Sequence, residues 1–225
     1  FMSIPMIKEK ILLGYPINYE DKVFIYPPKV RDVVGNDNFH RYRAAITVSQ
    51  FDIEDRLIRK DEKTGQPIMS DENIIVPTPL ESILVDSYYN AEFKKIVEEA
   101  FFFFTRQPII FLFDEEDKSI VVGEIDSATP DFSNLLILNE NNFLEFQNIV
   151  RMCLGDAPQG TYFADENPKI RHMKALARYR DRTKSQQDGG VQLETLITSV
   201  CCMNLGLNPL NIGELAYAAL FMLSD

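Results

Sequence analysis

The sequence predicts an α+β fold, in which a small antiparallel sheet is packed with helices and is followed by an all-helical C-terminal subdomain. Three observations lead to this prediction. Short β-rich runs bounded by turn residues alternate with helical patterns, a capping box marks one helix start, and apolar residues after position 167 recur at helical spacing. We therefore expect an α+β body over 1–154, a connecting loop over 155–167 and a helical subdomain over 168–225.

The first residues predict a β-hairpin. Apolar or alternating runs over 10–13 and 23–26 flank a polar segment over 18–21, as two strands flank a turn, and Pro27 and Pro28 close the second run.

Helical patterns follow over 37–49 and 51–58. The stretch 60–77 is rich in charge and contains Gly and Pro, so we expect an exposed loop there.

The clearest local signal is the capping box formed by Thr78, Pro79, Leu80 and Glu81. Thr78 can accept a hydrogen bond from the Glu81 amide while the Glu81 carboxylate reaches back, and proline suits the first helical position. This pattern predicts a helix over 79–89, and Asn90 can then cap a second helix.

That second helix carries an apolar stripe with the spacing of a buried face. The stripe consists of Phe93, Ile96, Val97, Ala100, Phe101 and Phe104. Phe102 and Phe103 lie off the stripe, so this end of the helix either is buried on more than one side or meets a partner. We expect burial.

The runs 108–113 and 119–123 predict an antiparallel hairpin whose connection contains the acidic residues 114–117. The acids do not have the spacing of a calcium loop, so we interpret them as a solvated hairpin tip and expect no metal site. Residues 135–138 could add a strand. A helix after Asn139 would complete the body, with one apolar face made of Phe143, Phe146, Val150 and Cys153.

The region 168–186 predicts a long basic helix in an otherwise acidic chain. The net charge is −11, yet positions 168–185 hold seven basic residues and one acidic residue. The basic residues are Lys169, Arg171, Lys174, Arg178, Arg180, Arg182 and Lys184. This helix could contact a phosphate backbone, with Tyr179 available for stacking. Alternatively, it could dock on the acidic remainder of this protein or on an acidic neighbouring subunit. We favour the protein partner because the acidic chain repels polyanions.

Two apolar helices are expected at the C-terminus. The first has its stripe at Leu193, Leu196, Ile197, Val200 and Met203, and the second at Ile212, Leu215, Ala216, Ala219, Leu220 and Leu223. Leu215, Ala219, Leu220 and Leu223 could offer an apolar face to a partner, or they could be buried within the monomer or an oligomer.

The sequence carries no familiar catalytic, cofactor-binding or metal-binding motif. Its two histidines, His40 and His172, each lie beside an arginine, which disfavours the charged intermediate of a histidine base. Cys153, Cys201 and Cys202 lack zinc-ligand spacing, so we expect buried, reduced thiols. We therefore expect no enzyme activity and no cofactor; a deep polar pocket lined by carboxylates would revive an enzyme hypothesis.

The apolar residues 100–104 and 108–113 are interrupted and too few to span a bilayer. The first residues do not show a basic stretch followed by an apolar one, so we expect no cleaved secretion signal. We expect a cytoplasmic protein with no membrane partner.

Several segments resemble phage and prophage tail assembly chaperones. They are 11–14 (ILLG), 23–28 (VFIYPP), 141–146 (NNFLEF) and 199–214 (SVCCMNLGLNPLNIGE). The resemblance implies a non-enzymatic protein of the host cell cytoplasm that binds tape-measure and tail-tube proteins during virion tail morphogenesis and forms a homo-oligomer. The alternative is a nucleic-acid-binding protein that uses the basic helix 168–186 and a C-terminal helix-turn-helix.

Overall fold

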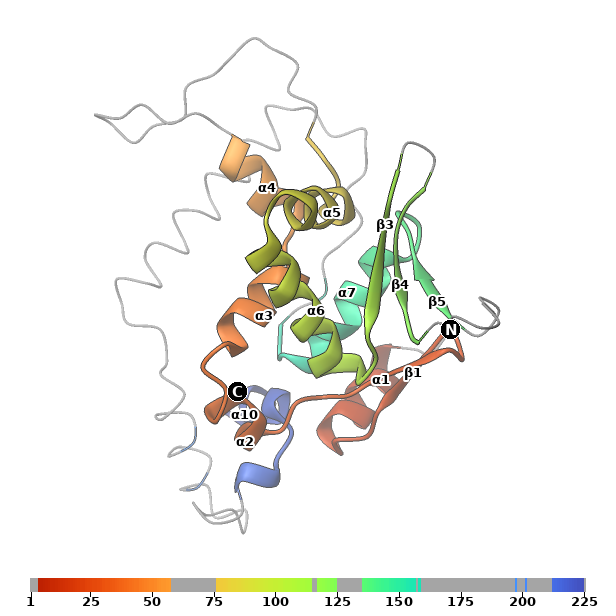
Figure 1. The fold of residues 1–225 in the computed structure, drawn as a ribbon. Helices are drawn as coiled ribbons and strands as arrows, with labels where there is room; N and C mark the ends of the chain where they lie inside the picture. Colours follow the sequence, from red (N-terminus) through yellow and green to blue (C-terminus); the bar gives the residue numbers. More distant parts are fainter. Residues whose placement is uncertain are drawn as a thin grey trace, which may run out of the picture.

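The computed structural model describes residues 4–57, 76–114, 117–124, 135–156, 158, 197, 201 and 212–224, and these adopt the predicted α+β fold (Figure 1). In chain order the elements are α1 (Ile4–Leu12), β1 (Ile17–Tyr19), β2 (Val23–Ile25), α2 (Val30–Val34), α3 (Phe39–Ile46), α4 (Gln50–Leu57), α5 (Pro79–Tyr89), α6 (Ala91–Thr105), β3 (Ile109–Phe113), β4 (Lys118–Val122), β5 (Leu136–Leu138), α7 (Phe143–Cys153), η1 (Ile212–Glu214) and α10 (Tyr217–Ser224). Within these ranges, no helix is both long and apolar enough to cross a membrane.

The predicted strand over 10–13 is wrong, because that stretch belongs to the end of α1 and the turn after it. Ile7 and Ile11 lie one helical turn apart and are both buried, so helical spacing decides the structure here. The hairpin instead joins β1 to β2. Its turn holds Glu20 and Asp21 at positive φ, as the right-handed twist of a tight hairpin favours.

Short helix α2 follows Pro27 and Pro28 and was not predicted. The Asp32 carboxylate accepts a hydrogen bond from the Lys29 backbone N–H, which stabilises the first turn. Helices α3 and α4 confirm the two helical patterns expected after it. The predicted loop 60–77 lies outside the described residues except for positions 76 and 77.

Helices α5 and α6 begin as predicted. Thr78 Oγ1 accepts from the Glu81 N–H at 3.2 Å, and the Glu81 carboxylate accepts from the Thr78 N–H at 3.0 Å. Asn90 then accepts from the Glu92 and Phe93 N–H groups, both at 3.0 Å. These hydrogen bonds satisfy N–H groups that would otherwise lack partners at each helix start.

The predicted hairpin and third strand form one antiparallel sheet with strand order β3-β4-β5. Figure 1 shows β3 and β5 at its two edges, with α7 beside the sheet. The four apolar residues expected on α7 are all buried. In the core, the ring of Phe146 on α7 stacks on that of Phe101 on α6, with centroids 5.4 Å apart.

The C-terminal elements described by the structure pack on the α+β body. Helix α10 contacts α1 and α7, and η1 contacts α2. Backbone hydrogen bonds join Val30 N–H to Leu215 C=O at 2.9 Å and Tyr217 N–H to Pro28 C=O at 2.7 Å. The predicted basic helix 168–186 lies outside the described residues. Of the apolar stripe expected over 193–203, the structure describes Ile197 alone. Ile197 and the nearby Cys201 are both helical and partly buried against the core.

Candidate protein-binding surface

Three aromatic side chains, Tyr88, Tyr89 and Phe113, form an exposed cluster that we call the aromatic patch. Their exposed fractions are 70%, 81% and 37%. The Tyr88 ring lies 5.1 Å from that of Tyr89 and 5.9 Å from that of Phe113, measured between centroids. Large aromatic groups exposed together are characteristic of protein-binding surfaces, because rigid rings bury much area at little entropic cost.

The elements place this patch where α5 ends and β3 ends. The buried stripe of α5 contains Leu80, Ile83 and Leu84, which points Tyr89 away from the core and leaves Tyr88 at the border of the stripe. Phe113 is the last residue of β3 and pairs with Lys118 of β4.

Lys118 also ties α5 to the sheet. Its ammonium donates to the Glu81 carboxylate at 2.6 Å. This hydrogen bond, together with the one from the Thr78 backbone, holds the pKa of Glu81 below its ordinary value. The start of α5 is therefore anchored to the strand that pairs with Phe113.

A second surface feature is an open groove of about 450 Å³ between α3, α6 and the start of β3. Its lining includes Tyr42, Glu98, Glu99, Phe102 and Arg106. Burial and a hydrogen bond to Glu99 at 2.8 Å raise the pKa of Tyr42. The groove therefore combines aromatic rings with charges of both signs.

Phe102 corrects one expectation about α6. Its side chain is 53% exposed, so the predicted burial is wrong at this position. Phe103 is partly buried, as expected, and its ring lies 5.9 Å from those of Phe39 and Tyr42. The side of α6 that carries Phe102 thus faces the groove and not the core.

The C-terminal apolar face is largely unavailable to a partner. Ala219 and Leu220 are 1% and 0% exposed, so the alternative of burial within the monomer holds for both. Leu215 is partly buried against the core, and Leu223 lies in α10 with its side chain outside the described set. Ala219 and Leu220 therefore pack α10 on the body.

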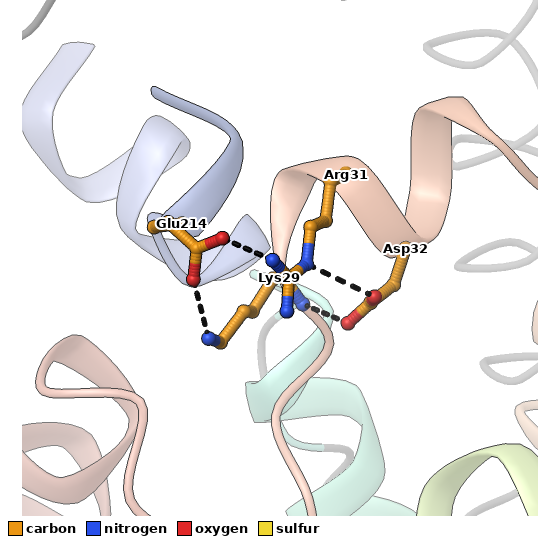
Figure 2. Close-up of polar contacts among 4 residues, drawn as sticks. All are labelled: Lys29, Arg31, Asp32 and Glu214. Carbon is orange, nitrogen blue, oxygen red and sulfur yellow. Dashed lines mark hydrogen bonds and ion pairs between the residues drawn. The ribbon is translucent and has the colours of Figure 1, made fainter. Parts of the chain in front are cut away.

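A polar cluster at η1 supports this arrangement (Figure 2). Glu214 accepts from the Lys29 ammonium at 2.7 Å and also pairs with Arg31, which in turn lies 3.8 Å from Asp32. The Lys29 hydrogen bond and the nearby Arg31 hold the pKa of Glu214 below its ordinary value. The cluster links η1 to the start of α2, two segments far apart in sequence.

The basic residues predicted to bind a partner, Lys169, Arg171, Lys174, Arg178 and Arg182, lie outside the described residues, as does His172. His40 is exposed on α3. Cys153 is a buried free cysteine, and its burial raises the pKa of its thiol. Cys201 is also free but is partly exposed. Cys202 lies outside the described residues.

Asp114 and Asp117, the described residues of the acidic connection, are exposed at the hairpin tip, as predicted. Asp117 N–H donates to the Asp114 side chain at 2.7 Å, and Asp114 N–H donates to the Asp117 carbonyl at 3.0 Å. Among the residues whose positions are described, no group of three or more His, Cys, Asp or Glu side chains could hold a metal ion.

Sequence reasoning missed the aromatic patch. The signal was present, since the apolar stripe of α5 leaves Tyr89 on the opposite side of the helix. The contact with Phe113 could not be foreseen, because it depends on how α5 packs on the sheet.

A search against protein-family models, curated proteins and solved structures finds no match to this chain.

Proposed function

We propose that this protein is a non-enzymatic tail assembly chaperone of a phage or prophage, which binds tape-measure and tail-tube proteins in the host cytoplasm before the tail is built. The resemblance of segments 11–14, 23–28, 141–146 and 199–214 to such chaperones motivates the proposal. The structural observation that supports it most is the aromatic patch.

The physical argument concerns what a chaperone of this kind must do. It must cover apolar surface on a client that would otherwise aggregate, and exposed aromatic rings suit that task. Tyr88 and Tyr89 have hydroxyl groups as well as rings, so they can meet both apolar and polar parts of a client. The net charge of −11 favours solubility of the resulting complex.

The gene neighbourhood offers a first test. A tail-tube gene upstream and a very long tape-measure gene downstream would support the proposal strongly. Neighbours that belong to an unrelated metabolic operon would count against it.

Co-purification offers a direct test. A tagged chain is co-expressed with the tape-measure and tail-tube proteins of the same genome, and the amount of each client that co-elutes is measured. We expect Tyr88→Ala combined with Tyr89→Ala to reduce recovery strongly, because most of the aromatic patch is then removed.

The matched control is Tyr15→Ala, since Tyr15 is also a largely exposed tyrosine, at 59%, but follows α1. This control should retain client binding. Failure of the unsubstituted chain to retain either client would contradict the proposed function.

A further inference from the structure

Strand β3 is an edge strand with an unusual composition. Its five residues, Ile109 to Phe113, are all apolar, and the neighbouring charges, Arg106 and Asp114, lie beyond its ends. Edge strands usually carry a charge or a proline that prevents another strand from pairing with them. Strand β3 has neither within its length.

The phase of the β3-β4 ladder shows which backbone groups face outward. Gly123 N–H donates to Pro108 C=O at 2.9 Å, so these two residues form a hydrogen-bonded pair. Because such pairs alternate along an antiparallel ladder, Ile110 and Leu112 also direct their N–H and C=O groups toward β4. The N–H and C=O groups of Ile109, Phe111 and Phe113 therefore point to the outer edge. In the described parts of the chain, no backbone or side-chain group forms a hydrogen bond with them.

We propose that β3 pairs with β3 of a second copy of this chain, antiparallel and centred on Phe111, so that the two sheets become continuous across a two-fold axis. In this register Phe111 lies opposite its own counterpart and Ile109 lies opposite Phe113. All three outward-facing residues of each strand then exchange hydrogen bonds with the partner strand. If one strand slid along the other by two residues in either direction, fewer of the outward-facing N–H and C=O groups of Ile109, Phe111 and Phe113 would find partners on the other strand.

Charge favours this orientation. The chain is basic just before β3, at Arg106, and acidic just after it, at Asp114 and Asp117. Antiparallel pairing brings the acidic tip of each copy toward Arg106 of the other, whereas parallel pairing would place two acidic tips together. The charges at the two ends of β3 are thus complementary when two copies of the strand pair antiparallel.

The side chains offer apolar surface for the same contact. Ile110 is 37% exposed on the sheet face opposite α6, and Phe113 is continuous with Tyr88 in the aromatic patch. Pairing would place Ile110 of one copy opposite Leu112 of the other. This inference concerns self-association and does not depend on the proposed function.

The two edges of the sheet provide a matched pair of variants. Ile110 on β3 and Ile137 on β5 are both isoleucines, are 37% and 38% exposed, and lie on the same face because each pairs with Val121 of β4. The full chain, Ile110→Lys and Ile137→Lys are compared by sedimentation velocity over a concentration series, with circular dichroism confirming that each is folded. We expect dimers for the unsubstituted chain and Ile137→Lys, and loss of the dimer for Ile110→Lys.

Disulfide formation between two copies tests the register of the proposed β3–β3 pair. Unlike the lysine variants, this test introduces no charge into the strand. Ile110→Cys and Leu112→Cys chains are oxidised separately and as a mixture, with the unsubstituted chain as the background for the native cysteines. We expect cross-linked dimers to increase in the mixture, because the two positions lie opposite each other in the proposed pair. The inference fails if the unsubstituted chain is monomeric throughout the series, if both lysine variants behave alike, or if the mixture cross-links no more than the separate chains.

Discussion

Glu81 joins the start of α5 to strand β4 through one carboxylate. It caps α5 by accepting from the Thr78 backbone at 3.0 Å, and it binds Lys118 of β4 at 2.6 Å. A helix cap of this kind contributes about 1 kcal/mol in typical proteins. The capping box is thus both a local helix signal and a tertiary contact.

The lowered pKa of Glu81 makes its contribution depend on pH. A carboxyl group whose pKa is lower in the folded chain stabilises the fold above its unfolded pKa, ordinarily 4.5, and this stabilisation is lost as the pH falls through the lower folded value. We expect Glu81→Gln to reduce the free energy of unfolding at pH 7, and the difference from the unsubstituted chain to shrink below pH 4.5. Urea unfolding at a series of pH values measures this difference. A difference that stays constant from neutral to strongly acidic pH would contradict this role.

At the scale of elements, α6 has a core face and an open side. Phe101 is fully buried and stacks on Phe146, while the next residue, Phe102, is half exposed in the groove. Two adjacent phenylalanines on one helix therefore have different roles.

Alanine substitution should separate these roles. Phe101→Ala should lower the free energy of unfolding by about 3–5 kcal/mol, because it leaves a cavity in the core. Phe102→Ala should change it by about 0.5 kcal/mol or less, as is usual for exposed positions. Chemical denaturation of both variants measures the difference, and equal losses would show that the side of α6 carrying Phe102 is also packed.

The sequence predicted those elements whose signals are local. The capping box located α5, the apolar stripe located α6, and the alternation of β-rich runs with an acidic turn located β3 and β4. Each pattern is complete within its own segment, so packing did not need to be known.

Elements that depend on distant contacts were missed or misread. The end of helix α1 was predicted to be a strand over 10–13. Its two buried residues, Ile7 and Ile11, are too few to show the 3.6-residue period of a helix. The hairpin turn contains Glu20 and Asp21 at positive φ and lacks the glycine that usually marks such a turn. The burial of Ala219 and Leu220 and the exposure of Tyr88 likewise follow from tertiary packing.

On the scale of the whole molecule, the described end of the chain is part of the main core. Leu220 and Tyr217 of α10 belong to the same hydrophobic cluster as Phe101 and Ile11. At the contact with α7, Gly155 has a φ of +79°, and an added Cβ would lie 2.7 Å from the Phe221 ring. Close packing therefore fixes α10 on the body.

This integration predicts cooperative unfolding. Leu220→Ala should lower the free energy of unfolding by about 2–5 kcal/mol and should shift the transition that reports on the sheet and α6. Urea unfolding followed by circular dichroism and tyrosine fluorescence tests whether both signals move together. A variant in which the main transition stays in place would indicate that α10 is energetically separate.

The protein is thus acidic and has a packed α+β core. Its aromatic patch lies beside β3, an edge strand of the described three-stranded sheet. We propose that the protein acts by binding other proteins through the aromatic patch.

Isothermal titration calorimetry can test this proposal, with the tape-measure protein as the proposed client. It is titrated into the unsubstituted chain, the Tyr88→Ala/Tyr89→Ala variant and the Tyr15→Ala control. We predict saturable binding to the unsubstituted chain and the control, and a dissociation constant at least about tenfold higher for the double variant, which corresponds to a loss of about 1.4 kcal/mol. The same affinity for all three proteins, or heat indistinguishable from dilution in every titration, would contradict the proposal.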